Sequence, residues 1–548
     1  MDKRLKDPIY GYIDIPMEYM ENVIDTAVFQ RLRRVMQTSY APLFSSAIHN
    51  RFVHSIGVFY LGKIAAAVLK RELLKNTVCD EDTIQKYADI YQAACLLHDV
   101  GHAPFSHTGE GFYKTDDYKT VELHKRLLSV TGSPEFQKDI PKEESQAAAP
   151  HEIMSSIIGI KEFGDFLLKD NASKEFFARC ITGYRYSEAG IDNDIRNCFI
   201  TMLNSKVIDV DRLDYLIRDA YITGFETVNI DYMRLLQALT VVSWKGRYQT
   251  AYYKDALSVI ENAVYAHDAE KKWIQNHPVV LYECYLLKHI ITCLNEKLNH
   301  KNRKLFSAEA MSSEGIVLKN RVQVSLLCDD DIIYLFKNML DDDISKEFFE
   351  RRKRRHPVWK SEAEYKAYIG SLSLEGRLKD EFLDCLKSFV GGNQKDMQMP
   401  ITINTDLEAK LEKELEDSEK QLENVTNEMD RISFQRQNKG TKDRLNLCRY
   451  LNGYAKDHGL KDDFIIIRTD MFNSGFSKSE ITKLLNVFKQ GEDKIVKLFS
   501  EVCSTLKADG IKEEFYYLYY RSGEAKGIEG KEKFCKDMYH AAHSLREI

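Results

Sequence analysis

Apolar residues recur at intervals of three and four positions through much of the first 300 residues, and this spacing predicts α-helices. The helical segments are expected over residues 17–74, 90–97, 151–232 and 256–300. Residues 108–150 differ, because they are rich in charge, glycine and proline, and we expect them to form an inserted loop or lobe. The first part of the chain is therefore predicted to be a helical core with one insertion.

Strand-like patterns are confined to shorter segments. Residues 241–255 combine aromatic and β-branched side chains around a Lys-Gly pair, which predicts a β-hairpin. Residues 463–468 and 514–520 are apolar runs typical of strands, and the stretch at 477–507 between them is predicted to be helical. Together they indicate a small α+β lobe.

Residues 407–437 carry apolar side chains at heptad-like spacing among Glu and Lys, which is typical of a coiled-coil hairpin arm. The apolar positions are Leu411, Leu415, Leu422, Val425, Met429 and Ile432. The expected fold class is therefore mainly α-helical, with this arm and the small α+β lobe following the core.

The composition narrows the class of protein. The 548 residues are 44% hydrophobic and 30% charged, with a net charge of −6, which is an ordinary globular balance and does not favour nucleic acid as the main partner. The eleven cysteines include no CxxC pair, so we expect reduced thiols. The first residues are charged where a signal peptide needs an apolar run, and we expect a cytoplasmic protein with no membrane span.

The candidate chemistry is concentrated in three motifs. His98-Asp99 ends an apolar helical run, His54 lies upstream in NRFVH, and Asp211 lies downstream in IDVDRLDY. Two imidazoles and two carboxylates form a mixed N/O set suited to Mn, Mg, Fe or Zn, with positions open for water and a phosphate oxygen. These residues predict a hydrolytic metal centre.

A His-Asp pair alone is more often a helix cap or a salt bridge than a metal site. The argument for a metal rests on the joint occurrence of RFVH, HDVGH and DVDRLDY, in that order and each next to a helical segment.

These residues resemble the HD-domain deoxynucleoside triphosphate triphosphohydrolases, some of which carry a SAM domain before the HD domain. The similar blocks are DPIYGYIDI, IDTAVFQRLRRVMQ, HNRFVHSIGV, LLHDVGHAPFSH, PHE and IDVDRLDYLIRDAYITG. The resemblance implies an HD-domain catalytic core over residues 1–300 with the insertion at about 108–150. This core would be followed by a helical regulatory region (301–400), the coiled-coil arm (401–440) and the α+β lobe (441–548).

The resemblance also implies roles for single residues. One divalent ion or more would be held by His54, His98, Asp99 and Asp211. The proton chemistry would fall to His107, His151 and Glu110, which stands where the family usually has Asp. Substrate contacts would come from Arg51, His102 and Arg212 at the phosphates, from Gln37 and Asp219 at the 3′-hydroxyl and from Tyr215 at the sugar. Tyr265 also matches the family. The alternatives are buried helix-end histidines at His102 and His107, and a plain core aromatic at Tyr215. His124 matches no family block, and we expect it at the surface.

Lys3, Asp25, Gln30 and Arg33 match positions that hold an activating nucleotide at a subunit interface in regulated relatives. The resemblance therefore implies a nucleotide effector, GTP or a dNTP, and a homo-oligomer. The alternative is that IDTAVFQRLRRV is an ordinary amphipathic helix whose polar residues are exposed to solvent and bind no effector. The basic run at residues 351–355 is expected to be a solvated helix end, with a phosphate or single-stranded nucleic acid site as the alternative.

The function expected from all of this is metal-dependent hydrolysis of dNTPs to deoxynucleoside and inorganic triphosphate, by attack of water at the α-phosphorus. A biological role in nucleotide-pool control or antiviral defence is expected by analogy alone. Two rivals stay open: an HD phosphodiesterase or nuclease that acts on a cyclic nucleotide or single-stranded nucleic acid, and a non-catalytic nucleotide sensor. The presence of His107 and His151 argues against a sensor, which needs no proton donor.

Overall fold

The computed structural model divides the chain into two compact units, each of which is described separately. The first comprises Met1–Ile274, Ile290–Leu340 and Asn473–Ile511, and the second comprises Gln275–His289, Asp341–Phe472 and Lys512–Ile548. The residues described are 2–113, 120–205, 207–225, 229–300, 303–370, 377–391, 399–422, 427–469, 475, 479–490, 493–503, 515–523 and 527–542.

The first unit opens with an antiparallel hairpin of β1 (Asp2–Asp7) and β2 (Gly11–Pro16). Asp7 closes its turn, because its Oδ1 accepts hydrogen bonds from the backbone N–H groups of Ile9 and Tyr10. Four short helical turns follow, namely α1 (Met17–Tyr19), a π-turn (Met20–Ile24), α2 (Ala27–Gln30) and a 3₁₀ turn (Arg31–Arg34).

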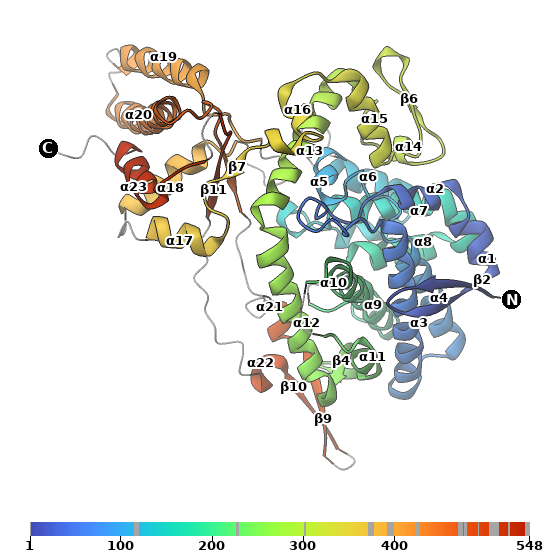
Figure 1. Cartoon of the computed structure of the whole chain (residues 1–548). Helices are drawn as coiled ribbons and strands as arrows, with labels where there is room; N and C mark the ends of the chain where they lie inside the picture. Colours follow the sequence, from blue (N-terminus) through green and yellow to red (C-terminus); the bar gives the residue numbers. More distant parts are fainter. Residues whose placement is uncertain are drawn as a thin grey trace. The chain divides into compact units, whose positions relative to one another are not determined.

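The core of this unit is a group of packed helices around α3, which is blue in Figure 1. They are α3 (Arg51–Asn76), α4 (Glu81–Leu97), α7 (Pro150–Leu167), α8 (Asn171–Thr182), α9 (Ile191–Leu203) and α10 (Val210–Thr223). Among the described helices, α3 is long and apolar enough to cross a membrane. Most of it is buried inside this unit, so it is the central core helix. The prediction of a mainly α-helical fold is confirmed.

The segment predicted as an insertion contains regular structure. It holds α5 (His107–Glu110), 3₁₀ turns at Gly111–Tyr113, Pro134–Asp139 and Glu144–Gln146, and α6 (Thr120–Thr131), which packs on α7. His124 of α6 is buried and its Nε2 lies 2.8 Å from the Tyr184 hydroxyl. The prediction of a surface position for His124 is therefore wrong, because α6 turns this face toward α8 and its neighbours.

The predicted hairpin is confirmed as β3 (Leu239–Trp244) and β4 (Arg247–Tyr253). Lys245 and Gly246 both have positive φ, 51° and 76°, as a two-residue hairpin turn requires. A second hairpin, β9 (Leu485–Gln490) and β10 (Asp493–Leu498), extends this sheet in the order β10-β9-β4-β3, with β9 parallel to β4.

The expected helix over 477–507 is wrong. Of its described residues, 479–490 and 493–503, only the short segments α21 (Ser479–Thr482) and α22 (Phe499–Val502) are helical. Alternate residues of β9, Leu485 and Val487, are buried against β4, and this two-residue period overrides the helical pattern.

The remaining elements of the first unit complete its packing. They are α11 (Tyr232–Gln237), a 3₁₀ turn (Lys254–Ala256), α12 (Leu257–Glu270), a π-turn (Lys271–Gln275), the end of α13 (Pro278–Leu298), α14 (Ala308–Met311), β5 (Ile316–Val317), a 3₁₀ turn (Lys319–Arg321), β6 (Gln323–Val324) and α15 (Asp329–Met339). The compact division groups the described residues of 290–340 and 473–503 with the helical core. The domain boundaries at 300, 400 and 440 stay predictions.

The second unit is built on a three-stranded sheet in the order β7-β11-β8. Its elements are α16 (Asp343–Glu347), a 3₁₀ turn (Arg351–Lys353), β7 (His356–Pro357), α17 (Glu362–Gly370), α18 (Arg377–Ser388), α19 (Thr405–Leu422), α20 (Glu428–Asp457), β8 (Ile465–Arg468), β11 (Tyr516–Tyr520) and α23 (Lys531–Ala542). Strands β8 and β11 confirm the two apolar runs predicted as strands.

Helices α19 and α20 form the predicted antiparallel pair. Arg449 bonds to Glu412 at 2.5 Å and Asn452 to Glu408 at 2.7 Å, which fixes their register. The heptad reading fails toward the tip, because Met429 is 77% exposed and Ile432 is 41% exposed. Val425 lies outside the described residues. The apolar contacts lie instead at the base, where Leu407 and Leu411 are buried.

The basic run at residues 351–355 is not a simple solvated helix end. Arg354 is buried and its Nη1 lies 2.6 Å from Glu283 Oε2. Arg355 is also buried, and it pairs with Asp463 and Glu347. Two of the five charges are therefore structural and are compensated within this unit.

Candidate active site

The site begins at the first turn of α3. Asn50 caps this helix by accepting a hydrogen bond from Val53 N at 3.3 Å, which places Arg51 and His54 on the same face, three residues apart. Gly57 lies one turn further on, where α10 crosses α3. A Cβ at Gly57 would come within 2.0 Å of Asp214 Oδ1, so only glycine allows α10 to approach this closely.

The four predicted metal ligands come together between α3, α4 and α10. His54 Nε2 lies 3.2 Å from His98 Nε2, 3.0 Å from Asp211 Oδ1 and 3.6 Å from Asp99 Oδ2. His98 Nε2 lies 3.6 Å from Asp99 Oδ1 and 3.5 Å from Asp211 Oδ1. His54, His98 and Asp99 are buried, whereas the Asp211 side chain is 38% exposed, so the cluster faces solvent on the Asp211 side.

These atoms suit a divalent ion. His98 Nδ1 lies 2.9 Å from Cys95 O, which leaves Nε2 to face the cluster. Burial raises the pKa of Asp99, but Arg51 and the two histidines outweigh this and hold the pKa of Asp99 well below its usual range. A permanently ionised carboxylate beside two imidazoles is the ligand set expected for Mn, Fe or Zn. The described residues therefore can hold a metal of this class.

A carboxylate that the sequence analysis missed orients His54. Asp214 Oδ2 lies 2.7 Å from His54 Nδ1, and the Arg218 guanidinium holds Asp214 through two contacts of 2.9 Å. Burial lowers the pKa of His54, but hydrogen bonds to Asp211 and Asp214 outweigh burial and raise the pKa to about 10. Arg218 also contacts Asp7 Oδ2 at 3.0 Å, so the first hairpin supports the site. Asp214 lies inside IDVDRLDY, but the motif alone does not tell which aspartate faces the metal.

Arg51, predicted to contact phosphate, is engaged within the site. Its Nη1 lies 2.7 Å from Asp99 Oδ2 and its Nε donates to Ser106 Oγ at 2.8 Å. Arg51 is only 3% exposed. The structure thus places its charge behind the cluster, where it fixes Asp99.

The loop that carries His102 is held from two directions by residues that sequence reasoning did not identify. Arg31 Nη2 donates to the backbone carbonyls of Val100 and His102, at 2.8 and 3.0 Å. Asp329 accepts a hydrogen bond from Phe105 N at 2.8 Å, next to a turn in which Phe105 and Ser106 both have positive φ. Non-glycine residues adopt this conformation only under surrounding constraint. Arg31 and Asp329 supply that constraint.

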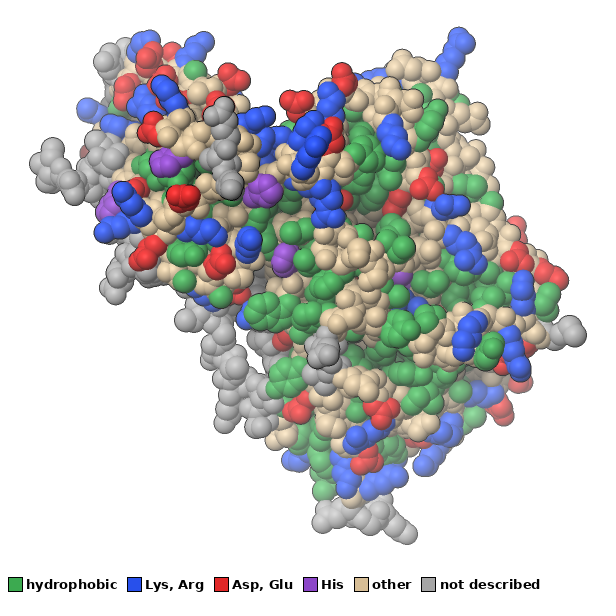
Figure 2. Space-filling view, in the orientation of Figure 1, with side chains coloured by type: hydrophobic (Ala, Val, Ile, Leu, Met, Phe, Trp, Pro, Cys, Tyr) green, Lys and Arg blue, Asp and Glu red, His purple; other side chains and the backbone are tan. Residues whose placement is uncertain are grey.

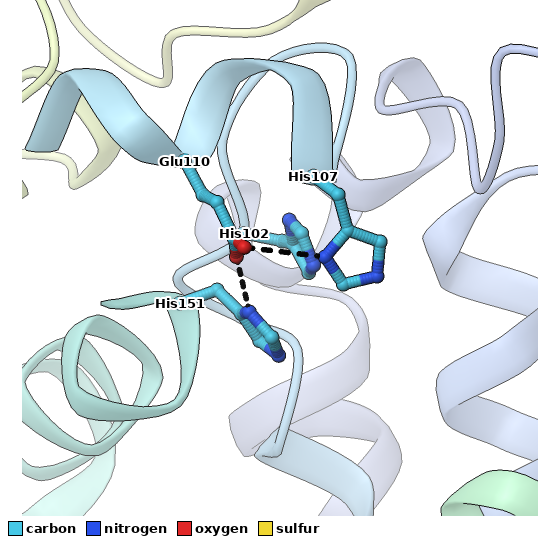
Figure 3. A group of neighbouring side chains, drawn as sticks. All are labelled: His102, His107, Glu110 and His151. Atoms are coloured by element: carbon cyan, nitrogen blue, oxygen red, sulfur yellow. Dashed lines mark hydrogen bonds and ion pairs between the residues drawn. The ribbon is translucent and has the colours of Figure 1, made fainter. Parts of the chain in front are cut away.

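A second cluster lies on the same loop and on α7, and we call it the histidine cluster; it comprises His102, His107, Glu110 and His151 (Figure 3). The Glu110 carboxylate lies between two of the rings, with Oε2 2.5 Å from His151 Nδ1 and Oε1 3.5 Å from His107 Nδ1. His102 stacks on His151 with ring centroids 4.3 Å apart. The substitution of Glu for the usual Asp thus still reaches both histidines.

Electrostatics differ among the members of the histidine cluster. Burial lowers the pKa of His151, but Glu110 outweighs this and raises it to about 9. Burial, Arg51 and the neighbouring histidines hold the pKa of His102 well below that of a free imidazole. At neutral pH, His151 therefore carries a proton and His102 does not.

The residues implied for the sugar lie around His49, which the sequence analysis did not single out. His49 Nε2 lies 2.7 Å from Asp219 Oδ1, and its carbonyl accepts a hydrogen bond from Gln37 N at 3.0 Å. Gln37 and Asp219 are both buried, and Gln37 Oε1 has no hydrogen-bond partner among the described residues. The predicted pair is thus bridged by a histidine in AIHNRFVH.

Three other predicted substrate contacts lie on α10 and α12. Arg212 Nη1 donates to Val207 O at 2.8 Å. Burial and the Arg212 charge act in opposite directions on Tyr215, and burial dominates, so the pKa of Tyr215 is raised. Tyr265 lies on α12 and is 42% exposed.

The residues implied for an effector also form one group. Lys3 Nζ lies 3.9 Å from Asp25 Oδ2, and Arg33 Nε donates to Gln30 Oε1 at 2.8 Å. The Arg33 guanidinium also lies 3.5 Å from the centre of the Phe52 ring. Arg31, which holds the His102 loop, belongs to the same short helical turn as Arg33.

Comparison with known proteins agrees with this geometry. The HD domain family matches residues 51–168, which include the first three metal-cluster residues and all of the histidine cluster. A deoxynucleoside triphosphate triphosphohydrolase SAMHD1 from Danio rerio is 30% identical over 264 residues, which is 45% of this chain and 37% of the relative.

Two relatives are described as uncharacterized. MG461 of Mycoplasma genitalium is 29% identical over 262 residues, covering 47% of this chain and 52% of the relative. MJ1154 of Methanocaldococcus jannaschii is 24% identical over 382 residues, covering 69% and 67%. The match spans about half the length of the first of these relatives. The chain therefore carries an HD domain whose residues can hold a metal ion, and over about half of its length it is similar to a protein described as a deoxynucleoside triphosphate triphosphohydrolase.

Proposed function

We propose that this protein hydrolyses dNTPs to deoxynucleoside and inorganic triphosphate, with His54, His98, Asp99 and Asp211 as the metal ligands. The observation that carries the proposal is that residues 98–110 contribute both to the His/Asp metal cluster and to the histidine cluster, in which Glu110 holds His151. Cleavage at the α-phosphorus needs charge neutralisation, an oriented water and a proton for the leaving 5′-oxygen.

Each part of the site has a place in this reaction. A divalent ion would supply Lewis-acid activation of the phosphate and of water. Glu110 holds His151 through Nδ1, so His151 Nε2 is free to give a proton to the leaving oxygen. His107 lies beside Glu110 with its side chain 66% exposed, so this part of the cluster faces solvent.

Recognition of the nucleotide falls to the residues around α10. Gln37 and Asp219, bridged by His49, would bind the 3′-hydroxyl, and Tyr215 would line the sugar pocket. His102, Arg212 and Tyr265 would contact the triphosphate or its surroundings. Lys3, Asp25, Gln30 and Arg33 would bind a GTP or dNTP effector in a homo-oligomer, and Arg31 would link that group to the His102 loop.

A nuclease acting on single-stranded nucleic acid is less well supported. Arg354 and Arg355 are neutralised within the second unit, and on the face drawn in Figure 2 basic and acidic side chains are interspersed. A cyclic nucleotide is the competing substrate class, and the test includes it.

The test is to incubate the purified protein with Mn²⁺ or Mg²⁺ and each dNTP and rNTP, singly and in mixtures, alongside a cyclic nucleotide and a single-stranded oligonucleotide. We expect triphosphate and deoxynucleoside in equal amounts. Release of pyrophosphate or monophosphate instead, or cleavage of the cyclic nucleotide alone, would contradict the proposal. A rate that needs a nucleotide mixture would support the effector group.

A further inference from the structure

The histidine cluster has the composition of a second metal site. One ligand atom from each of His102, His107, Glu110 and His151 lies within 4.8 Å of every other. Three imidazole nitrogens and one carboxylate oxygen form a four-ligand set of the kind that binds Zn²⁺ and other borderline transition ions. The set shares no residue with the cluster of His54, His98 and Asp99.

The spacing of the donors suits tetrahedral coordination. Ligand atoms bound to Zn²⁺ at about 2.0–2.1 Å are about 3.3 Å apart in a tetrahedron. Glu110 Oε1 and His107 Nδ1 are 3.5 Å apart, close to this value. Glu110 Oε2 and His151 Nδ1 are 2.5 Å apart, so they would separate by less than an ångström to admit the ion.

His102 is the independent observation that points to a ligand. It is 0% exposed, and neither ring nitrogen has a hydrogen-bond partner among the described residues. Buried polar atoms are normally satisfied, and an unpartnered one marks an unseen water, ion or functional role. Its ring lies against those of His107 and His151, with centroids 5.1 and 4.3 Å away, so its free nitrogens belong to the same group (Figure 3).

The group also has an entry side. The His107 side chain is 66% exposed, whereas those of Glu110 and His151 are 13% and 12% exposed. His107 lies at the start of the four-residue helix α5 (Figure 3). An ion from solvent can therefore meet His107 first and then pass to the half-buried Glu110 and His151 and to the buried His102.

We propose that the histidine cluster binds a second transition-metal ion, Zn²⁺ or one of similar preference, independently of the ion held by the HD residues. Binding would take up His151 and Glu110 and so block proton delivery to the leaving group. This inhibitory consequence rests on the proposed function, whereas the binding itself does not.

The test counts bound zinc in the full-length protein after equilibrium dialysis, by elemental analysis, with Co²⁺ visible absorption as a second readout of tetrahedral coordination. We expect two ions per chain in the wild type and one in Asp211→Ala. We also expect His107→Gln and His151→Gln to weaken one of the two sites by at least tenfold. His300→Gln, which changes an exposed histidine, is the matched control and should keep both ions.

A wild-type protein that binds one ion, or a second ion that is unaffected by His107→Gln and His151→Gln, would overturn the proposal. The proposed function fails separately. If no nucleotide is hydrolysed but two ions bind as described, the site stands and the reaction does not. If dNTPs are hydrolysed and zinc added to the Mn²⁺-loaded enzyme leaves the rate unchanged, the inhibitory consequence is wrong.

Discussion

The two clusters at the end of α4 use similar side chains in very different surroundings. In the metal cluster, His54 is fixed through Nδ1 by Asp214, Asp99 by Arg51 and His98 by a backbone carbonyl. In the histidine cluster, the His102 ring has no hydrogen-bond partner among the described residues and the His107 ring is mostly exposed. The first arrangement fixes the orientation of these three ligands, whereas the second leaves two of its rings able to accept an ion.

This difference separates two tasks that a phosphohydrolase must perform. A metal ligand gains affinity from rigid outer partners, because they orient the ring before binding. A proton donor needs access to solvent and a neighbour that adjusts its pKa. Substitutions in the metal cluster should therefore impair metal binding, whereas substitutions in the histidine cluster should impair proton transfer.

The largest effect is expected at the metal cluster. Asp211→Ala removes a carboxylate that contacts both His54 and His98. Metal contributes several kcal/mol to charge stabilisation, so we expect the rate of hydrolysis to fall by about 10³-fold or more, together with loss of one bound ion. Full activity at unchanged metal content would show that Asp211 is not a ligand.

A somewhat smaller effect is expected in the histidine cluster. His151→Gln should lower kcat by about 10²–10⁴-fold while the ion at the HD residues is retained. Because the pKa of His151 is raised to about 9, the wild type should hold this proton below that pH and lose activity as pH rises through about 9. A pH–rate profile in zinc-free buffer checks this. The assignment is wrong if His151→Gln and His107→Gln are both fully active.

Asp214, which orients His54, allows a test of whether rigid outer partners support metal binding. Asp214→Asn removes the buried carboxylate that Arg218 and His54 share and leaves Arg218 with Asp7 alone, so we expect stability to fall by about 3 kcal/mol and metal affinity by about 10–100-fold. Urea unfolding and metal titration measure the two effects. A variant with normal stability and normal metal affinity would mean that Asp214 has no role in orienting His54.

The support of the His102 loop should have a more modest effect. Asp329→Ala removes the acceptor for Phe105 N and for Met36 N, and we expect a loss of about 1–3 kcal/mol in stability and a lower kcat. Asp329→Asn keeps one acceptor oxygen and should recover part of both. If kcat is unchanged in both variants, the loop holds its shape without Asp329.

The smallest effect is expected at His124, outside both clusters, in the pH dependence of folding stability. Burial lowers the pKa of His124, so the unfolded chain binds this proton more readily than the folded one. The group therefore costs no stability above about pH 6.5 and reduces stability as pH falls below that value. His124→Phe should remove this part of the pH dependence, measured as the difference in urea unfolding between pH 7.5 and 5.5. An identical pH dependence in the variant would contradict it.

The sequence was sufficient to predict those site residues that lie within a recognisable motif. His54, His98, Asp99 and Asp211 each lie in a motif at a helix end, and the joint occurrence of these motifs was enough to mark them as one candidate site. The packing of α3, α4 and α10 brings them together. Asp329 could not be found in this way, because its partner Phe105 lies more than 200 positions away. The role of Arg31 likewise depends on tertiary contacts with backbone carbonyls, which carry no sequence signal.

The error at residues 477–507 has a similar origin. The apolar residues of β9 fit either a helix or a strand over so short a segment, and the choice was decided by the exposed edge of β4. Local pattern predicted β3 and β4, which pair with each other, but not the strand that arrives from another part of the chain.

Strand β9 lies far behind β4 in the chain, and this order affects folding during synthesis. During synthesis the β4 edge emerges long before β9, and at about 5–20 residues per second the interval lasts on the order of ten seconds or more. Unpaired strand edges invite association with other chains, so the nascent protein should depend on chaperones over this interval. A shortened chain that ends near residue 300 would keep this edge open permanently and should precipitate unless residues 473–511 are supplied.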